Sequence, residues 1–366
     1  MRKIQLLALR LPVLLLLISL LSCVAPFIKP SERLTGHVAR VMDITWSPDN
    51  REVASCGFDG TVRVWDTQKQ TSTAVFNTDS PWVLSVVWSP DGKRLAVTTN
   101  TSVEVWDPVS DKRVVQLATG PAVAHGPRNI YAAWSPDGRR LALYGWPDGS
   151  IKIISSEDGT EVALLTKGTA MVSSVEWSRD GKRIASAGWD RKLRFWDTAT
   201  WAETSEVDLD IYGVIKIAWS PDGKRLSWHG YLNDELVLWD TVANKLERKL
   251  TVPSGITAAA WSPDGHMIAT ASGNGTVDLW DAETGALKRS LLHENPIDRM
   301  AWSRDSKHIA TVPFGENVVK VWDVATGDVN PLVGEAGSVT ALAWSRDGKR
   351  LATGNYDGSV LVWDKF

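Results

Sequence analysis

Short apolar strands that alternate with turn-forming residues dominate the chain from residue 37 onward. In SVVWSPDGKRLAVTT, residues 85–99, one apolar segment ends at Trp88 and a second begins at Leu95. Between them, Ser-Pro-Asp-Gly favours a tight turn, because proline presets the dihedral angle of the first corner and glycine accepts the left-handed conformation that follows. The pattern predicts a β-hairpin.

This unit recurs along almost the whole chain. It is marked by Trp-Ser-Xaa-Asp at a spacing of about 43 residues, which is typical of propeller blades. The eight copies begin at Trp46, Trp88, Trp134, Trp177, Trp219, Trp261, Trp302 and Trp344. In three units arginine replaces the turn proline, at Arg179, Arg304 and Arg346.

A third predicted strand follows in each unit and usually ends on Trp-Asp. The first copy is DGTVRVWD, residues 59–66, whereas the third unit has Ile154-Ser155 at the corresponding place. The remaining endings begin at Trp106, Trp196, Trp239, Trp280, Trp322 and Trp363.

Gly36-His37, the Ser-Pro-Asp-Gly turns, Asp-Gly-Thr-Val and the Trp-Asp endings together resemble the WD40 repeat family over residues 32–366. The resemblance implies an all-β fold: a closed β-propeller with four antiparallel strands per blade around a central channel, which binds partners and is usually not catalytic. Eight units predict one eight-bladed domain. Because the last unit stops after its third strand, SERLTGH, residues 31–37, is expected to supply the outer strand of the last blade.

Residues 1–22 have the features of a secretory signal peptide, because a basic N-terminus precedes a leucine-rich stretch. Leu20-Leu21-Ser22-Cys23 resembles the lipobox of bacterial lipoproteins, which implies acylation of Cys23 after cleavage. Residues 23–31 would then link the lipid to the propeller, residues 32–366. We therefore expect an extracytoplasmic, membrane-anchored lipoprotein. A secreted or periplasmic protein and an uncleaved N-terminal membrane anchor are the alternatives.

The charge balance argues against nucleic acid as a partner. The chain has 40 Lys and Arg against 43 Asp and Glu, and no run of basic residues stands out. Of the two cysteines, Cys56 lies in an apolar strand pattern and is expected to be buried. No cofactor or metal motif is apparent. We therefore expect no cofactor and no metal ion, and a monomer that binds a protein or a peptide.

Serine, histidine and aspartate recur at fixed distances from the tryptophans, which invites comparison with a hydrolase triad. In the first unit these residues are His37, Ser55 and Asp59, followed by Trp65. The resemblance to WD40 repeats implies instead a buried hydrogen-bond network that ends on the indole N–H. A catalytic group has no reason to recur at blade spacing, so we favour the structural role. The other predicted network members are Ser186, Asp190, Trp196, Thr353, Asp357 and Trp363.

In WD40 propellers, partners commonly contact the narrower rim around the channel. The contacts come from the residue before the turn aspartate and from the residues six and four before the first-strand tryptophan. At these positions the candidate binding residues are Phe58, Trp189, Tyr356, Arg40, Met42, Trp82, Leu84, Arg128 and Ile130. Trp146 and Trp228 lie in less regular versions of the same turn. Aromatic and arginine side chains dominate interface energies, whereas plugging of the channel mouth is the alternative role.

The sequence therefore favours a non-catalytic interaction platform that presents this rim to a protein or peptide. A TolB-like periplasmic propeller is an alternative, because WSPDGKRLA also resembles that family's repeat, although that family lacks the Trp-Asp ending. An eight-bladed quinoprotein-type enzyme is a further alternative. It would need calcium ligands and commonly a vicinal cysteine pair, and the sequence shows neither.

Overall fold

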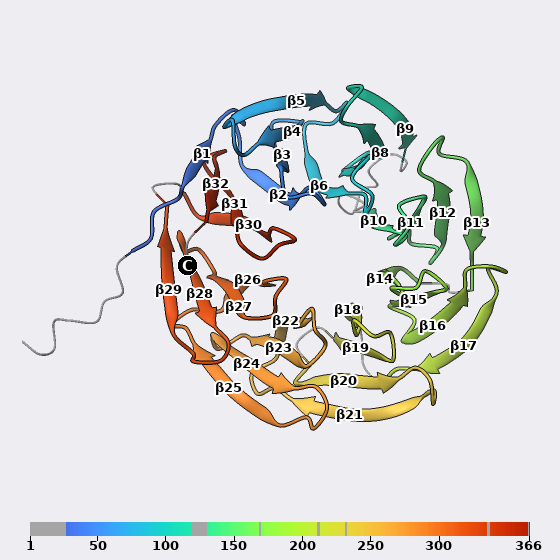
Figure 1. Ribbon diagram of the computed structural model, residues 1–366. Coiled ribbons are helices and arrows are strands. Elements are labelled where there is room, and N and C mark those ends of the chain that lie inside the picture. Colours follow the sequence, from blue (N-terminus) through green and yellow to red (C-terminus); the bar gives the residue numbers. More distant parts are fainter. Residues whose placement is uncertain are drawn as a thin grey trace, which may run out of the picture.

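The strands of the chain form a closed ring of radial sheets around a central axis (Figure 1). The computed structural model describes residues 27–118, 130–167, 170–210, 213–230, 233–334, 337–364 and 366. Within these residues, 32 strands make eight antiparallel four-stranded sheets and no helix is present. The predicted eight-bladed all-β propeller is confirmed.

The innermost strand of every blade ends at the tryptophan that marks the repeat. These strands are β2 (Val41–Trp46), β6 (Val83–Trp88), β10 (Tyr131–Trp134), β14 (Val172–Trp177), β18 (Val214–Trp219), β22 (Ile256–Trp261), β26 (Ile297–Trp302) and β30 (Val339–Trp344). The Ser-Xaa-Asp turn then reverses the chain into the second strand. The second strands are β3 (Glu52–Gly57), β7 (Leu95–Thr99), β11 (Arg140–Tyr144), β15 (Arg183–Gly188), β19 (Arg225–Gly230), β23 (Met267–Ser272), β27 (His308–Pro313) and β31 (Leu351–Asn355).

The third strands carry the Trp-Asp ending in every blade except the third, and the outer strands complete each sheet. The third strands are β4 (Thr61–Asp66), β8 (Ser102–Asp107), β12 (Ile151–Ser155), β16 (Lys192–Asp197), β20 (Glu235–Asp240), β24 (Thr276–Asp281), β28 (Val318–Asp323) and β32 (Val360–Trp363). The outer strands are β5 (Thr71–Asn77), β9 (Lys112–Ala118), β13 (Glu161–Leu165), β17 (Glu203–Asp208), β21 (Lys245–Thr251), β25 (Leu287–Leu292), β29 (Val329–Val333) and β1 (Glu32–Leu34). We number the blades 1 to 8 from β2–β5 to β30–β32, and β1 belongs to blade 8.

The N-terminal end of the described chain closes the ring. Strand β1 pairs antiparallel with β32, with Glu32 opposite Val362 and Leu34 opposite Val360, as the sequence predicted. Ile28, four residues before β1, also pairs with the outer strand of blade 7. Its N–H donates to the Pro331 carbonyl and its carbonyl accepts from the Val333 N–H, both at 3.1 Å. Residues 28–34 therefore cover the outer edges of two neighbouring blades, which leaves fewer backbone groups unpaired.

Six of the eight first-strand tryptophans connect their blade to the inner strand of the blade before it. The indole N–H of Trp46 donates to the carbonyl of Ala343 at 3.0 Å, and that of Trp177 donates to the carbonyl of Ala133 at 3.1 Å. Equivalent bonds to the preceding blade's inner-strand carbonyl are made by Trp134, Trp219, Trp302 and Trp344. The hydrophobic clusters likewise lie between neighbouring blades, so the core is a ring of interfaces. Cys56 is fully buried in one of them, and its burial raises the pKa of the thiol.

Candidate partner-binding rim

The four residues predicted to form a network in blade 1 are hydrogen-bonded in series. His37 Nδ1 lies 2.8 Å from Asp59 Oδ2, and His37 Nε2 lies 2.8 Å from Ser55 Oγ. The indole N–H of Trp65 donates to the same Ser55 oxygen at 2.8 Å. Burial opposes ionisation of Asp59, but the interactions with His37 and the hydrogen bonds from Thr61 together outweigh it, and the pKa of the carboxyl lies well below its usual range. Because Ser55 is fully buried, this arrangement fits a hydrogen-bond network that stabilises the interior of the blade.

In two other blades the aspartate at this position pairs with an arginine. In blade 4, Ser186 accepts from Trp196 at 2.9 Å, while Asp190 pairs with Arg194 at 2.6 Å. In blade 8, Asp357 pairs with Arg33 of β1 at 3.1 Å. The side chain that pairs with the turn aspartate therefore differs among blades 1, 4 and 8.

Blade 8 departs from the predicted network, whereas blade 7 contains an equivalent network that was not predicted. In blade 8 the indole nitrogen of Trp363 has no hydrogen-bond partner among the described residues, so the predicted bond from Trp363 to Thr353 is wrong. The Thr353 hydroxyl instead accepts a long bond from Asn355 at 3.5 Å. In blade 7, which the prediction left out, Thr311 lies 3.1 Å from His293 Nε2 and accepts from Trp322 at 3.0 Å.

A repeated backbone hydrogen bond sets the conformation of the rim. The N–H of the residue before the turn aspartate donates to the carbonyl of the residue six before the first-strand tryptophan of the same blade. Phe58 donates to Arg40 at 3.0 Å, and Trp189 donates to Met171 at 3.0 Å. Tyr356 makes the same bond, to Ser338 at 2.9 Å. The bond ties two loops together and leaves the side chain at this position free of any role within the sheet.

Several predicted rim residues are exposed. The exposed fraction is 39% for Phe58, 48% for Trp82, 53% for Trp189 and 63% for Tyr356. The guanidinium of Arg40 lies 5.8 Å from the centre of the Tyr356 ring, and the rings of Phe58 and Trp82 lie 6.2 Å apart. Met42 and Leu84 are half-buried, and Met42 packs against the cluster between blades 1 and 2. Arg128 lies outside the described residues.

Two rim predictions are wrong, and a third is only partly met. Trp228 is 5% exposed, with its ring 5.9 Å from that of Trp239. It stands nine residues after Trp219, the place that Ser55 takes in blade 1, and this place faces the core. Ile130 is also buried, in the cluster between blades 2 and 3. Trp146 is half-buried against that cluster, with the Lys152 ammonium 5.3 Å from its ring.

Phe314 is a rim residue that the sequence analysis missed. It is 71% exposed and donates its backbone N–H to the Pro296 carbonyl at 2.7 Å, which is the bond that marks this position in the other blades. Gly315 follows it in place of the turn aspartate, so the motif was not recognised. The signal that could have found it is its distance of twelve residues from Trp302, which equals the distance from Trp46 to Phe58.

The exposed aromatic residues lie mainly on four consecutive blades. Phe314 belongs to blade 7, Tyr356 to blade 8, Arg40 and Phe58 to blade 1, and Trp82 precedes β6 of blade 2. We name these five residues the aromatic arc. Trp189 stands apart from the arc, on blade 4.

Two features of the described residues bear on catalytic chemistry. These residues contain no group of three or more His, Cys, Asp or Glu side chains that could hold a metal ion. The serine nearest to a histidine–aspartate pair, Ser55, already accepts from Trp65 and is closed to solvent. The arrangement is suited to presenting aromatic surface to a partner.

Comparison with known proteins supports the repeat assignment. A family model described as "Anaphase-promoting complex subunit 4 WD40 domain" matches residues 239–305. The model "WD domain, G-beta repeat" matches residues 28–66, 70–107, 159–197 and 329–364.

Curated relatives share parts of the chain at low to moderate identity. Coronin-7 of Rattus norvegicus is 35% identical over 104 residues, which are 28% of this chain and 11% of that protein. WD repeat-containing protein slp1 of Schizosaccharomyces pombe is 24% identical over 274 residues, covering 63% of this chain and 55% of that protein. WD repeat-containing protein 26 homolog of Arabidopsis thaliana is 25% identical over 257 residues, with shares of 67% and 41%. This chain thus spans 11% to 55% of the length of these relatives.

Proposed function

Because this chain belongs to the WD40-repeat β-propeller family, we propose that it is a non-catalytic platform whose aromatic arc binds a protein or a peptide. Proteins of this family are generally interaction scaffolds. The chain's own contribution is the set of aromatic side chains that the rim hydrogen bond keeps exposed on consecutive blades.

Exposure of several aromatic rings at one rim is the observation that carries the proposal. A single exposed apolar side chain is common and needs no explanation. Here Phe58, Tyr356 and Phe314 occupy the same place in three blades, and none of them completes a sheet or a core cluster. Aromatic and arginine residues are also the types that supply most of the binding energy at protein interfaces.

The test compares two double variants of the full propeller as bait for its binding partner. Phe58→Ala with Tyr356→Ala removes two rings of the arc, and we expect binding to weaken by about 2 kcal/mol or more, the scale of interface hot spots. The matched control replaces two exposed apolar residues elsewhere, Val242→Ala with Leu292→Ala. Affinity is measured for the partner that the wild type captures. Equal binding by both variants would show that the arc is not the binding surface.

We further propose that the protein is exported, anchored through acylated Cys23 and monomeric. The support is the signal-like sequence, and residues 1–26 lie outside the described part of the structure. No described helix is long and apolar enough to cross a membrane. Cys23→Ser should move the propeller from the membrane fraction to the soluble fraction or leave an unprocessed precursor. Incorporation of a labelled fatty acid by wild type and variant alike would contradict the lipid anchor.

A further inference from the structure

The Ser-Xaa-Asp turns pack against one another on the face opposite the rim. Each inner strand starts at a rim loop and ends at such a turn, so the turns lie at the far end of the strands. Among the described turns, a Cβ added to the turn glycine of blades 2, 3, 4, 6 and 8 would lie 3.2 to 3.7 Å from the turn of the preceding blade. Gly223 of blade 5 differs, because a Cβ there would meet no atom within 4 Å. The ring of packed Ser-Xaa-Asp turns is therefore open between blades 4 and 5.

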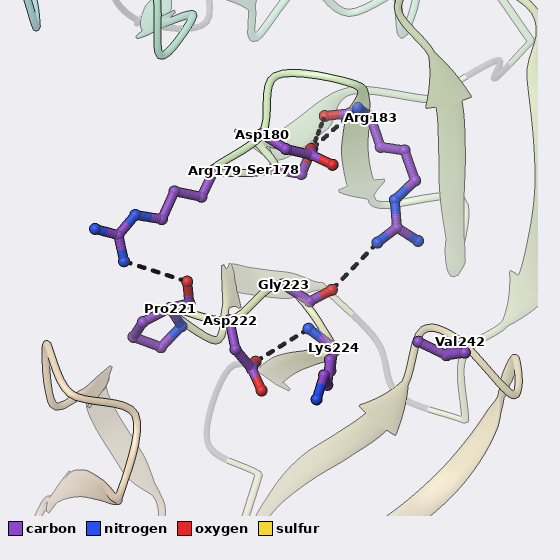
Figure 2. Close-up of a pocket in the computed structure, with 9 residues that line it drawn as sticks. All are labelled: Ser178, Arg179, Asp180, Arg183, Pro221, Asp222, Gly223, Lys224 and Val242. Carbon is purple, nitrogen blue, oxygen red and sulfur yellow. Dashed lines mark hydrogen bonds between the residues drawn. The ribbon is translucent and has the colours of Figure 1, made fainter.

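A cleft of about 440 Å³ occupies this opening. Arg179 of blade 4 stands at the turn position that five other blades fill with proline. Its guanidinium reaches across the cleft to the Pro221 carbonyl at 3.4 Å, and Arg183 donates to the Gly223 carbonyl at 3.1 Å (Figure 2). Two guanidinium groups from blade 4 thus approach the turn of blade 5.

The basic side chains of this cleft lack acidic partners. Among the described residues, Arg179, Arg183 and Lys224 form no ion pair. The two aspartates of the cleft are engaged in their own turns: Asp180 and Asp222 each accept a serine hydroxyl at 2.6 Å and a backbone N–H. Positive charge in the cleft is therefore only partly compensated.

In the next cleft around the ring, carboxylates neutralise the charge of the corresponding arginine. Arg225 of blade 5 stands six residues after its first-strand tryptophan, as Arg183 does in blade 4. It pairs with Glu247 at 2.7 Å and with Glu283 at 2.9 Å. Among the described residues, Arg183 has no such carboxylate partner.

We propose that the cleft between blades 4 and 5 binds a phosphate group through Arg179, Arg183 and Lys224. Arginine presents N–H donors in a fixed fork that matches phosphate oxygens. The guanidinium of Arg183 lies 4.7 Å from the centre of the Trp219 ring, which orients the fork before a ligand arrives. Among the described residues, Arg179 donates one hydrogen bond, to the Pro221 carbonyl. This site is independent of the aromatic arc.

The experiment measures binding of inorganic phosphate and of glycerol phosphate to the full chain by calorimetry, with ionic strength held constant by chloride. Arg179→Pro restores the residue that the turn has in five other blades, so the variant should fold. We expect it to weaken phosphate binding about tenfold, because a charge-assisted hydrogen bond is lost. Arg179→Lys should keep part of the affinity, since it retains the charge without the fork.

Arg304→Pro is the matched control, because Arg304 occupies the same turn position in blade 7. We expect it to leave phosphate affinity unchanged. Comparable affinity for both ligands would indicate that the site accepts a phosphate group on a larger molecule, and a preference for inorganic phosphate would indicate the free ion. Unsaturable titration of the wild type, or equal losses in Arg179→Pro and Arg304→Pro, would overturn the proposal.

Discussion

Glu176 offers a test of how the inner strands are stabilised. Strand β14 pairs on one side only, and so does β18 of the next blade, so their other edges face the channel without a strand partner. The Glu176 carboxylate accepts the backbone N–H of Trp219 on that free edge at 2.7 Å. Ser174 accepts the N–H of Ile217 in the same way at 3.1 Å. Burial raises the pKa of Glu176 from 4.5 to about 7, against the opposing effect of the Trp219 hydrogen bond.

The direction of the pH effect follows from proton binding. Because the folded state binds the Glu176 proton more tightly than the unfolded state, stability falls as the pH rises from about 4.5 to about 7 and remains lower above that range. A rise of this size corresponds to about 3 kcal/mol in the free energy of unfolding. Glu176→Gln cannot ionise and still offers an oxygen to the Trp219 N–H. We expect it to match the wild type at about pH 4 and to be more stable by about 3 kcal/mol at about pH 8.

Urea denaturation at these two pH values measures the difference. The control is Glu157→Gln, which makes the same substitution at an exposed carboxylate in the turn after β12. A Glu176→Gln variant that is less stable than the wild type at high pH would refute the reasoning. So would a stability gain of equal size at both pH values, because ionisation of Glu176 would then not be its cause.

Three further predictions concern the blades and their closure. Trp196→Ala should lower the free energy of unfolding by about 3–5 kcal/mol, as truncation of a buried aromatic residue does. Trp189→Ala should leave the melting temperature nearly unchanged. Similar melting temperatures for the two variants would disprove the assignment of Trp196 to the core and of Trp189 to the rim. Deletion of residues 27–34 should uncover the outer edges of blades 7 and 8 and promote aggregation. Light scattering during heating would detect the aggregates, and scattering equal to that of the wild type would mean that the ring closes without this segment. Asp59→Asn should destabilise the protein by about 2 kcal/mol at neutral pH. Because the pKa of Asp59 is depressed, the difference in stability from the wild type should shrink as the wild-type carboxyl protonates in strong acid. A difference in stability that persists in strong acid would contradict the role of the Asp59 charge.

Local sequence was sufficient to predict the blade count and the position of each turn. Strand alternation, Ser-Xaa-Asp turns and the tryptophan spacing are encoded within a few residues of one another, and these features need no distant contact to be recognised. The buried network in blade 1 could be predicted for the same reason, since His37, Ser55, Asp59 and Trp65 belong to one repeat. The sequence pattern also distinguished Trp196, which ends a third strand, from Trp189, which precedes a turn aspartate.

The errors at the rim arose where local turn patterns were irregular. Trp228 was assigned from its neighbourhood, but its place relative to Trp219 puts it in the core. Phe314 was overlooked because glycine follows it. Counting residues from the first-strand tryptophan is the better guide, because the hairpin fixes the position of later residues relative to that tryptophan, whatever the turn sequence.

Contacts between blades were decided by the tertiary structure alone. The sequence shows that Trp46 recurs, but not that its indole N–H would donate to the carbonyl of Ala343 at the other end of the chain. Nor does it show that the turns of blades 4 and 5 would be separated by a cleft beside Arg179. It also does not show that the Glu176 carboxylate would accept a backbone N–H on the unpaired edge of β18. A repeat specifies its own hydrogen bonds through short-range geometry. The partner across an interface depends on how each sheet is rotated against its neighbour, and that angle is fixed only when the ring closes and the clusters between the blades are packed.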